Sequence, residues 1–162
     1  MAQKPKPVLA TVMWDLASGG SDGSPVHLLF LASRCADKIL ANALRSSGLT
    51  PRQYAVLVTV GQNQGMSQAA VAEQVGVAGT TAAAIVRRLV EQGLLSRDRE
   101  GLVSCSIRLT GAGRQAINTT NPIATQVDNG IVAVVPARRR RQFVVDLAVL
   151  VKSHRAALTG RT

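Results

Sequence analysis

The segment Ser67–Leu95 combines two short helical patterns with almost nothing between them. Ser67 is a favoured N-cap residue and Gly76 suits the left-handed conformation that ends many helices, so the first helix is expected between them. The second pattern runs from about Gly79 to Gln92. Two short helices joined by a tight, glycine-containing turn predict a helix-turn-helix unit.

The spacing of the apolar residues changes after this unit, from a helical repeat to strict alternation. Apolar residues at 103, 105, 107 and 109 alternate with Ser104, Ser106 and Arg108, which is typical of a half-buried strand. The preceding LLSR is the expected partner strand, with DREGL as a short hairpin tip. A helix-turn-helix followed by a hairpin describes a winged helix-turn-helix, which places its second helix in the major groove of DNA.

Longer helical patterns lie on both sides of this unit. One helix is expected at about 26–44, and a second begins at a capping box formed by Thr50 and Gln53. A third begins at Thr110 and bends near Pro122, and the last runs over about 137–157. The sequence shows no internal repeat and no boundary between independent domains, so one compact structural unit is expected.

The charge of the chain favours an anionic partner. Nineteen Lys and Arg residues stand against nine acidic residues, which gives a formal net charge of +10. Nucleic acid is the commonest partner of so basic a chain, and a basic solvated surface without a specific partner is the alternative. Aromatic residues make up only 2% of the sequence, so the core is expected to consist of Ala, Val, Leu and Ile.

The second helix of the predicted unit has two contrasting faces. Ala82, Ile85, Val86 and Leu89 share an apolar face that is expected to pack against the rest of the domain. The opposite face carries Thr80, Thr81, Ala83, Ala84, Arg87, Arg88 and Glu91.

The chemistry of this outer face suits DNA. Threonines in the first helical turn can donate hydrogen bonds to phosphates or bases, next to the free N–H groups of the helix. The alanines allow close approach and contact with thymine methyl groups, and the arginines reach a guanine edge or a phosphate. The alternative is an ordinary amphipathic helix whose arginines meet only water.

The expected hairpin tip offers two further cations, Arg97 and Arg99. An arginine at such a tip can enter the minor groove, where negative potential is concentrated. The alternative is a tip closed by ion pairs, because Asp98 and Glu100 lie alongside. The candidate DNA-binding residues are therefore Thr80, Thr81, Ala84, Arg87, Arg88, Arg97 and Arg99.

Two stretches of the sequence together resemble the MarR family of bacterial transcription regulators. They are LTPRQYAVLVTVGQNQGMSQAAVAEQVGVAGTTAAAIVRRLVEQGLLSR and IRLTGAGRQAI, which cover about Leu49–Ile117. The resemblance implies a homodimer with interlocked first and last helices, in which two winged domains bind a pseudo-palindromic duplex. Family members usually repress transcription, and many leave DNA when they bind a small, often phenolic, ligand or when a cysteine is oxidised.

The resemblance and the helical patterns together predict a mainly α fold with a small β-hairpin wing. The expected parts are a flexible N-terminal arm (1–24), an N-terminal dimerisation helix (25–48), a winged helix-turn-helix domain (49–117) and C-terminal dimerisation helices (118–162). The implied partners are double-stranded DNA, a second copy of the chain, and a small anionic or phenolic ligand. The alternative function is a weakly sequence-specific architectural DNA-binding protein without a ligand.

The sequence departs from the family pattern at three places. The wing has EGLVS where the family carries an Asp and an Arg two residues apart. Ala78 is a poor N-cap, so Thr80 is expected to cap a later helix start. The last helix opens with four arginines, Arg138–Arg141, where the family tends to be acidic. They could be solvated or bind the partner subunit, an anionic ligand or DNA, and a solvated or intersubunit role is favoured.

Other classes of function have little support in the sequence. Cys35 and Cys105 are too far apart for a zinc cluster, and both lie on apolar stripes, so each is expected to be a buried hydrophobic residue rather than a redox sensor. No catalytic residues, cofactor or metal site are expected, and no enzyme activity. No apolar run is long enough to span a membrane and the start is too polar for a signal peptide, so a cytoplasmic protein is expected.

Overall fold

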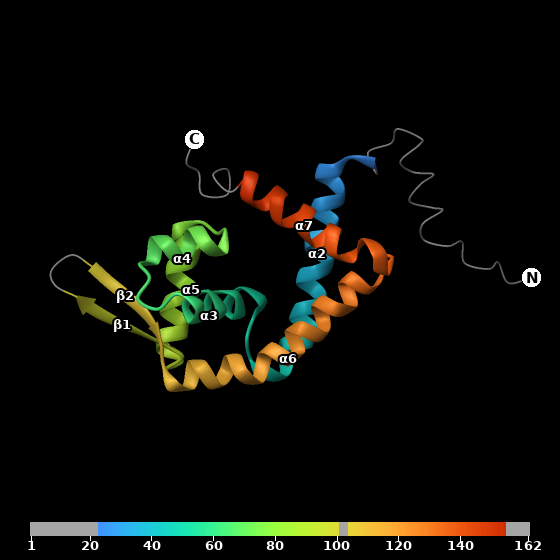
Figure 1. Ribbon diagram of the computed structural model, residues 1–162. Helices are drawn as coiled ribbons and strands as arrows, with labels where there is room; N and C mark the ends of the chain where they lie inside the picture. The colour runs from blue at the N-terminus through green and yellow to red at the C-terminus, as the bar shows by residue number, and fades with distance from the viewer. Residues whose placement is uncertain (1–22, 101–103, 155–162) are drawn as a thin grey trace, which may run out of the picture. The chain divides into compact units, whose positions relative to one another are not determined.

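The computed structural model describes residues 23–100 and 104–154, and it is mainly helical with one two-stranded antiparallel hairpin (Figure 1). This confirms the predicted fold class. The predicted arm, residues 1–24, lies almost entirely outside the described residues. The elements in order are α2 (Pro25–Ala43), η2 (Leu44–Ser47), α3 (Pro51–Gln62), α4 (Gln68–Val75), α5 (Gly79–Glu91), β1 (Leu95–Glu100), β2 (Ser104–Leu109), α6 (Gly111–Ala133) and α7 (Ala137–Ser153).

The chain divides into two compact units, residues 1–39 and 40–162, and each is described by itself. The described part of the first unit consists mainly of α2, in which no residue is buried. Cys35 is exposed, so the expectation that it is a buried hydrophobic residue is wrong. The apolar stripe of α2 exists, but a helical repeat in the sequence does not supply the surface that would bury it. The predicted four-part division of the chain stays a prediction.

The second unit has an aliphatic core beneath α3, α4, α5 and the hairpin, as the low aromatic content predicts. Leu57, Val71, Val86 and Leu89 are fully buried in it, and Ile107 is 1% exposed. The remaining buried members of this cluster are Leu49, Val56, Val60, Met66, Leu95 and Leu109.

The predicted helix starts are confirmed by their hydrogen bonds. Thr50 Oγ1 accepts from Gln53 N at 3.2 Å while Gln53 Oε1 accepts from Thr50 N at 2.9 Å, which is a complete capping box. Ser67 Oγ accepts from Ala70 N at 3.2 Å, and Gly76 ends α4 with φ 72°. The hydroxyl of Thr110 caps α6 by accepting a hydrogen bond from the third residue of the helix.

The hairpin is longer than the sequence predicted. Strand β1 continues to Glu100, which pairs with Ser104, so the tip is confined to residues 101–103, outside the described residues. Ile107 N donates to Met66 O and Ile107 O accepts from Gly65 N, which attaches the α3–α4 linker to the free edge of β2. Ser106 is 6% exposed, so this strand does not keep all its polar residues on a solvated face.

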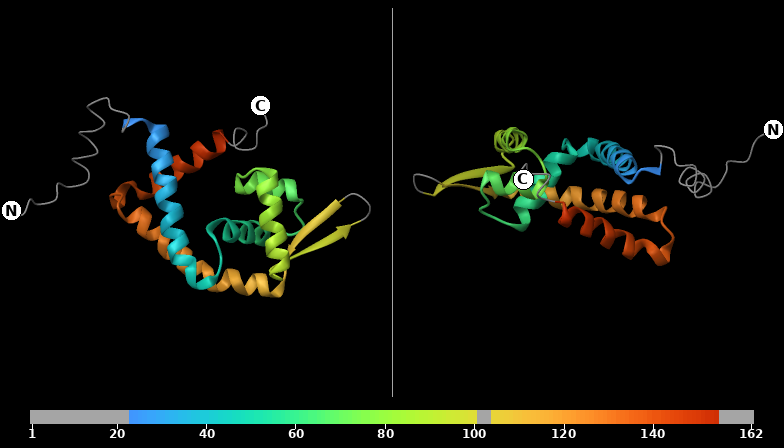
Figure 2. Two further views of the ribbon diagram at one scale, coloured as in Figure 1. Left: turned by 180° about the vertical axis from the view of Figure 1, so that it is seen from behind. Right: turned by 90° about the horizontal axis from the view of Figure 1, so that it is seen from above.

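Helix α6 leads away from the hairpin to a corner, at which α7 begins (Figures 1 and 2). Gly113, in its first turn, packs against the backbone of Leu94, and a side chain there would collide with the Leu94 carbonyl oxygen. Pro122 lies inside α6, where a proline cannot donate the helical hydrogen bond and produces a bend. The hydroxyl of Tyr54 donates to Asn121 Oδ1 at 2.7 Å and thereby joins α3 to α6.

Helix α7 has no buried residue although most of its second half is apolar. Its exposed large apolar side chains are Phe143, Val144, Val145, Leu147, Val149, Leu150 and Val151. At 100° per residue these positions surround the helix, and a helix that is apolar all round is normally buried. The described residues of the second unit therefore leave this apolar surface uncovered.

Within the described residues, no single helix is long and apolar enough to cross a membrane. The pair α4 and α5 passes such a test jointly on length and composition.

Candidate nucleic-acid interface

Helices α4 and α5 meet in the geometry of a helix-turn-helix. Their axes differ in direction by 110°, and the joining turn spans only Gly76–Ala78 (Figure 2). DNA-binding helix-turn-helix units typically have angles of about 90–120°. Gly76 permits the turn because its φ of 72° lies in the left-handed region.

The two predicted faces of α5 are present in the structure. Ala82, Val86 and Leu89 are fully buried, and Ile85 is partly buried against the same core. The opposite face is solvent-accessible: Thr80, Ala84, Arg87, Arg88 and Glu91 are exposed, and Thr81 and Ala83 are half-buried. The structure therefore brings five of the seven candidate DNA-binding residues onto one open helix face.

The N-terminus of α5 has no side-chain cap. The helix begins at Gly79 with Ala78 as N-cap, and Ala78 makes no side-chain hydrogen bond. The expectation that Thr80 caps a later start is wrong, because the backbone becomes helical one residue before it. Thr80 and Thr81 instead occupy the first turn, beside N–H groups that have no helical acceptor and are suited to bind phosphate oxygens.

The arginines of α5 differ in their surroundings. Arg87 Nε lies 3.8 Å from Glu91 Oε1, one turn later on the same face, and the two side chains are 73% and 66% exposed. A pair this exposed holds its members weakly. Arg88 is exposed and forms no ion pair with the residues that the structure describes. Arg88 is therefore the more available cation.

A groove of about 480 Å³ lies beside this face, between α5 and the start of α3. Its lining residues are Thr50, Gln53, Ala84, Ile85, Arg87, Arg88 and Glu91. The proximity of Thr50 and Gln53 to the outer face of α5 could not be predicted from the sequence, because no local signal links positions so far apart.

The hairpin places Arg97 differently from the prediction. It pairs with Ile107 within the ladder, on the strand face that also holds buried Leu95, and is therefore not at the tip. Its Nη2 donates to Oε1 of Gln68, in the first turn of α4, at 3.1 Å. This hydrogen bond joins a side chain of the hairpin to one of the helix-turn-helix. Arg97 thus holds the hairpin against α4, and it remains exposed.

An ion pair joins the two strands of the wing. Asp98 Oδ2 lies 3.1 Å from Arg108 Nε on the neighbouring strand. Arg99 pairs with Cys105 in the ladder, close to the tip, but both side chains lie outside what the structure describes. A minor-groove contact by Arg99 stays a prediction.

One titratable group of the unit departs from its ordinary behaviour. Burial raises the pKa of the Tyr54 hydroxyl, and the nearby Asp128 carboxylate raises it further. The hydroxyl therefore remains protonated and donates to Asn121 at neutral pH. Across the described ranges, no group of three or more His, Cys, Asp or Glu residues could hold a metal ion.

Comparisons with known proteins agree with this geometry. Residues 47–101 match a family model described as MarR family. A probable transcriptional regulator from Pseudomonas aeruginosa is 24% identical, with a TM-score of 0.74 over 80% of this chain and 98% of that chain. A MarR-family regulator from Rhodococcus sp. RHA1 is 22% identical, with a TM-score of 0.76 over 82% of this chain and 95% of that chain.

A third similar structure is the Mycobacterium tuberculosis MarR family protein Rv2887 in complex with DNA. It is 23% identical, with a TM-score of 0.65 over 78% of this chain and 97% of that chain. None of the curated proteins compared matches the chain significantly. Residues 47–101 thus match the MarR family model, and the chain shares the winged helix-turn-helix fold of these solved regulators.

Proposed function

We propose that the chain binds double-stranded DNA as a homodimer and represses transcription from a pseudo-palindromic operator. The observation that carries the proposal is the outer face of α5. It is open to solvent, bears Arg87 and Arg88, and projects at 110° from α4. The complex of the similar protein Rv2887 with DNA supports DNA as the partner.

The proposed contacts divide by chemistry. Thr80 and Thr81 bind a phosphate together with the uncapped N–H groups of α5. Ala84 lies against the base edges. Arg88 is the first candidate for a contact with a guanine or a phosphate, and Arg87 is the second. Arg99 is the proposed wing contact. Arg97 has a supporting role, because its bond to Gln68 orients the hairpin relative to the recognition helix.

The uncovered apolar side chains support the homodimer. Val26, Leu28, Leu29, Phe30 and Leu31 of α2 are exposed, as are the apolar residues of α7. A second copy would supply the same apolar surface and cover both helices by symmetry. Exposed apolar patches of this extent mark interaction sites on most proteins.

Sedimentation velocity tests the dimer directly. The wild-type chain is expected at the mass of two copies, and Leu147→Asp is expected to shift it toward one copy because a buried carboxylate would lack a partner. Asn129→Asp introduces the same charge at an exposed position of α6 and should leave the dimer unchanged. A wild-type monomer, or a dimer insensitive to Leu147→Asp, would contradict the proposed interface.

We further propose that a small aromatic carboxylic acid releases the protein from DNA. Rv2887 has been crystallised with salicylic acid and with p-aminosalicylic acid, and Bordetella bronchiseptica BpsR is regulated in DNA binding by 6-hydroxynicotinic acid. These ligands share an aromatic ring and a carboxylate. Salicylate added to the protein–duplex complex should lower fluorescence anisotropy, whereas cyclohexanecarboxylate at the same concentration should not.

Selection of bound duplexes from a random pool tests sequence recognition. Enrichment of an inverted repeat, with half-sites about one helical turn apart (roughly 34 Å), is expected of two symmetric recognition helices. Binding without enrichment would instead favour an architectural protein, for which charge and DNA shape dominate.

A further inference from the structure

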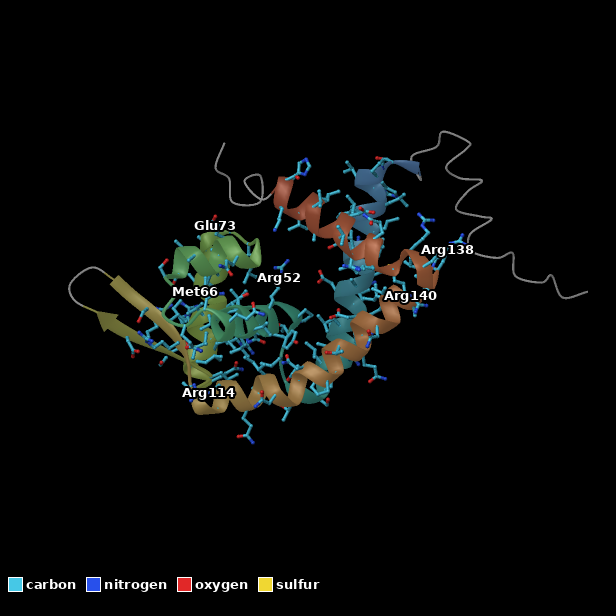
Figure 3. The ribbon with its side chains drawn as sticks, in the orientation of Figure 1. Arg52, Met66, Glu73, Arg114, Arg138 and Arg140 are labelled. Atoms are coloured by element: carbon cyan, nitrogen blue, oxygen red, sulfur yellow. The ribbon has the colours of Figure 1, made fainter. Side chains whose placement is uncertain are left out.

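The first turn of α7 carries four consecutive arginines, Arg138–Arg141, directly after the α6–α7 corner (Figure 3). Arg140 has a structural role. Its Nε donates to Val135 O at 2.9 Å and its Nη2 donates to Ala133 O at 3.0 Å. These carbonyls lie at the C-terminal end of α6, where helical donors are missing, so Arg140 closes the corner.

The other three arginines are exposed, and no ion pair to them is present in the described part of the chain. We call Arg138, Arg139 and Arg141 the basic corner. Its charges lie at the positive end of the helix dipole, the first turn contains no acidic residue, and the N-cap Pro136 makes no side-chain hydrogen bond. Such an arrangement is electrostatically unfavourable unless an anion compensates it.

The basic corner is separate from the outer face of α5. Arg114, near the start of α6, lies beside the hairpin, whereas Arg138 and Arg140 lie at the opposite end of that helix (Figure 3). The 23 residues of α6 follow a path of about 34 Å at the rise of an α-helix. An anion at the basic corner is therefore a second ligand rather than part of the duplex contacted by α5.

We propose that the basic corner binds the phosphate backbone of a second DNA segment, so that one protein assembly joins two duplexes. This inference goes beyond the proposed operator binding. Arg138 and Arg141 are three residues apart and share one helix face, so their guanidinium groups can bind neighbouring phosphates. The free N–H groups of α7 add donors for the same oxygens.

Several features favour DNA over other anions. All four side chains are Arg rather than Lys, and the guanidinium fork matches two phosphate oxygens. The basic corner precedes the apolar stretch Phe143–Val151 in α7, so its charges are distinct from the apolar surface that we propose is buried in the dimer. A chain of net charge +10 that also carries a DNA-binding motif already brings a polyanion into its neighbourhood.

A two-duplex capture assay tests the inference. The wild-type protein is bound to an immobilised duplex obtained by selection, and retention of a second, fluorescent duplex of random sequence is measured. Arg138→Glu/Arg141→Glu is expected to reduce retention by on the order of tenfold or more, because two phosphate contacts are lost. The same variant should bind the immobilised duplex normally, and its melting temperature should not fall, because acidic residues suit a helix N-terminus.

A matched control separates the site from general charge. Lys38→Glu/Arg45→Glu makes the same change in net charge at two exposed positions elsewhere and should keep most of the retention. An equal loss of second-duplex retention in both variants would overturn the inference. Full retention of the second duplex by Arg138→Glu/Arg141→Glu would also overturn it, as would preferential binding of the basic corner to anionic lipid vesicles. Wild-type protein that binds the first duplex but not the second would refute the inference alone. Failure to bind any duplex would refute the proposed function as well.

Discussion

Glu91 places a negative charge on the face of α5 that we propose to meet DNA, and its removal gives a quantitative test. Glu91→Gln frees Arg87, whose Nε lies 3.8 Å from the carboxylate, and removes repulsion with phosphate. For a carboxylate about 7 Å from a phosphate in water, Coulomb's law gives roughly 0.6 kcal/mol, and screening at moderate salt halves this. The remaining ~0.3 kcal/mol should raise affinity about 1.7-fold for each recognition helix that binds.

Fluorescence anisotropy titrations of the selected duplex over a series of salt concentrations measure this effect. Glu91→Gln should also steepen the dependence of log affinity on log salt by up to about 0.9 per recognition helix, since one more positive charge becomes available. The control is Asp146→Asn, which removes the same charge from α7, where Asp146 accepts a hydrogen bond from Gln142. Weaker binding by Glu91→Gln, or equal effects of the two substitutions, would refute the reasoning.

Two further predictions concern the stability of the winged domain and α6. Gly113→Ala should destabilise the folded protein by about 1–3 kcal/mol, because its Cβ would collide with the Leu94 carbonyl and force the backbone to move. Gly130→Ala, with open space around it, should stabilise the folded protein by about 0.5–1 kcal/mol. Urea unfolding measures both changes, and the opposite ranking of the two variants would show that α6 packs differently. Because burial, together with the nearby Asp128 carboxylate, raises the pKa of Tyr54 in the folded state, its protonated hydroxyl contributes stability below about pH 10 that is lost as pH rises through the folded-state pKa. Tyr54→Phe should therefore flatten the alkaline fall in unfolding free energy, and an unchanged pH profile would contradict this linkage.

The helix starts could be predicted because their determinants are local. Thr50 and Gln53 satisfy each other within three residues, and Ser67 reaches a backbone N–H at the same separation. These contacts depend on residue type and spacing alone, which a sequence displays directly. The buried and exposed faces of α5 were predictable for the same reason, since the helical repeat fixes which side chains share a face.

The contacts of the hairpin depended on partners far away in the sequence. Arg97 is held by Gln68, 29 residues earlier, so its position could not be inferred from its own neighbourhood. The part of β1 from Asp98 to Glu100 could not be predicted from apolar alternation, because its residues are polar. Backbone pairing with β2 holds this part of the strand in place. Cys35 was misplaced because an apolar stripe indicates a surface that needs covering, not what covers it.

The departures from the family pattern have different consequences in the structure. The uncapped start of α5 leaves N–H groups available beside Thr80, which suits phosphate binding. Arg140 is one of four arginines that look alike in the sequence, yet it alone hydrogen-bonds the end of α6 in the described residues. Only the three-dimensional arrangement separates this structural arginine from the exposed ones beside it.

Locating α5 on DNA tests its assignment as the recognition helix most directly. Ala84→Cys, in a background carrying Cys35→Ser and Cys105→Ser, allows an iron–EDTA cleavage reagent to be attached to the outer face of the helix, and Asn129→Cys on α6 provides the control. We expect cleavage of the selected duplex from Ala84→Cys at two positions about one helical turn apart, and little cleavage from the control. Equal cleavage from both positions, or none from Ala84→Cys while the duplex remains bound, would show that α5 is not the recognition helix.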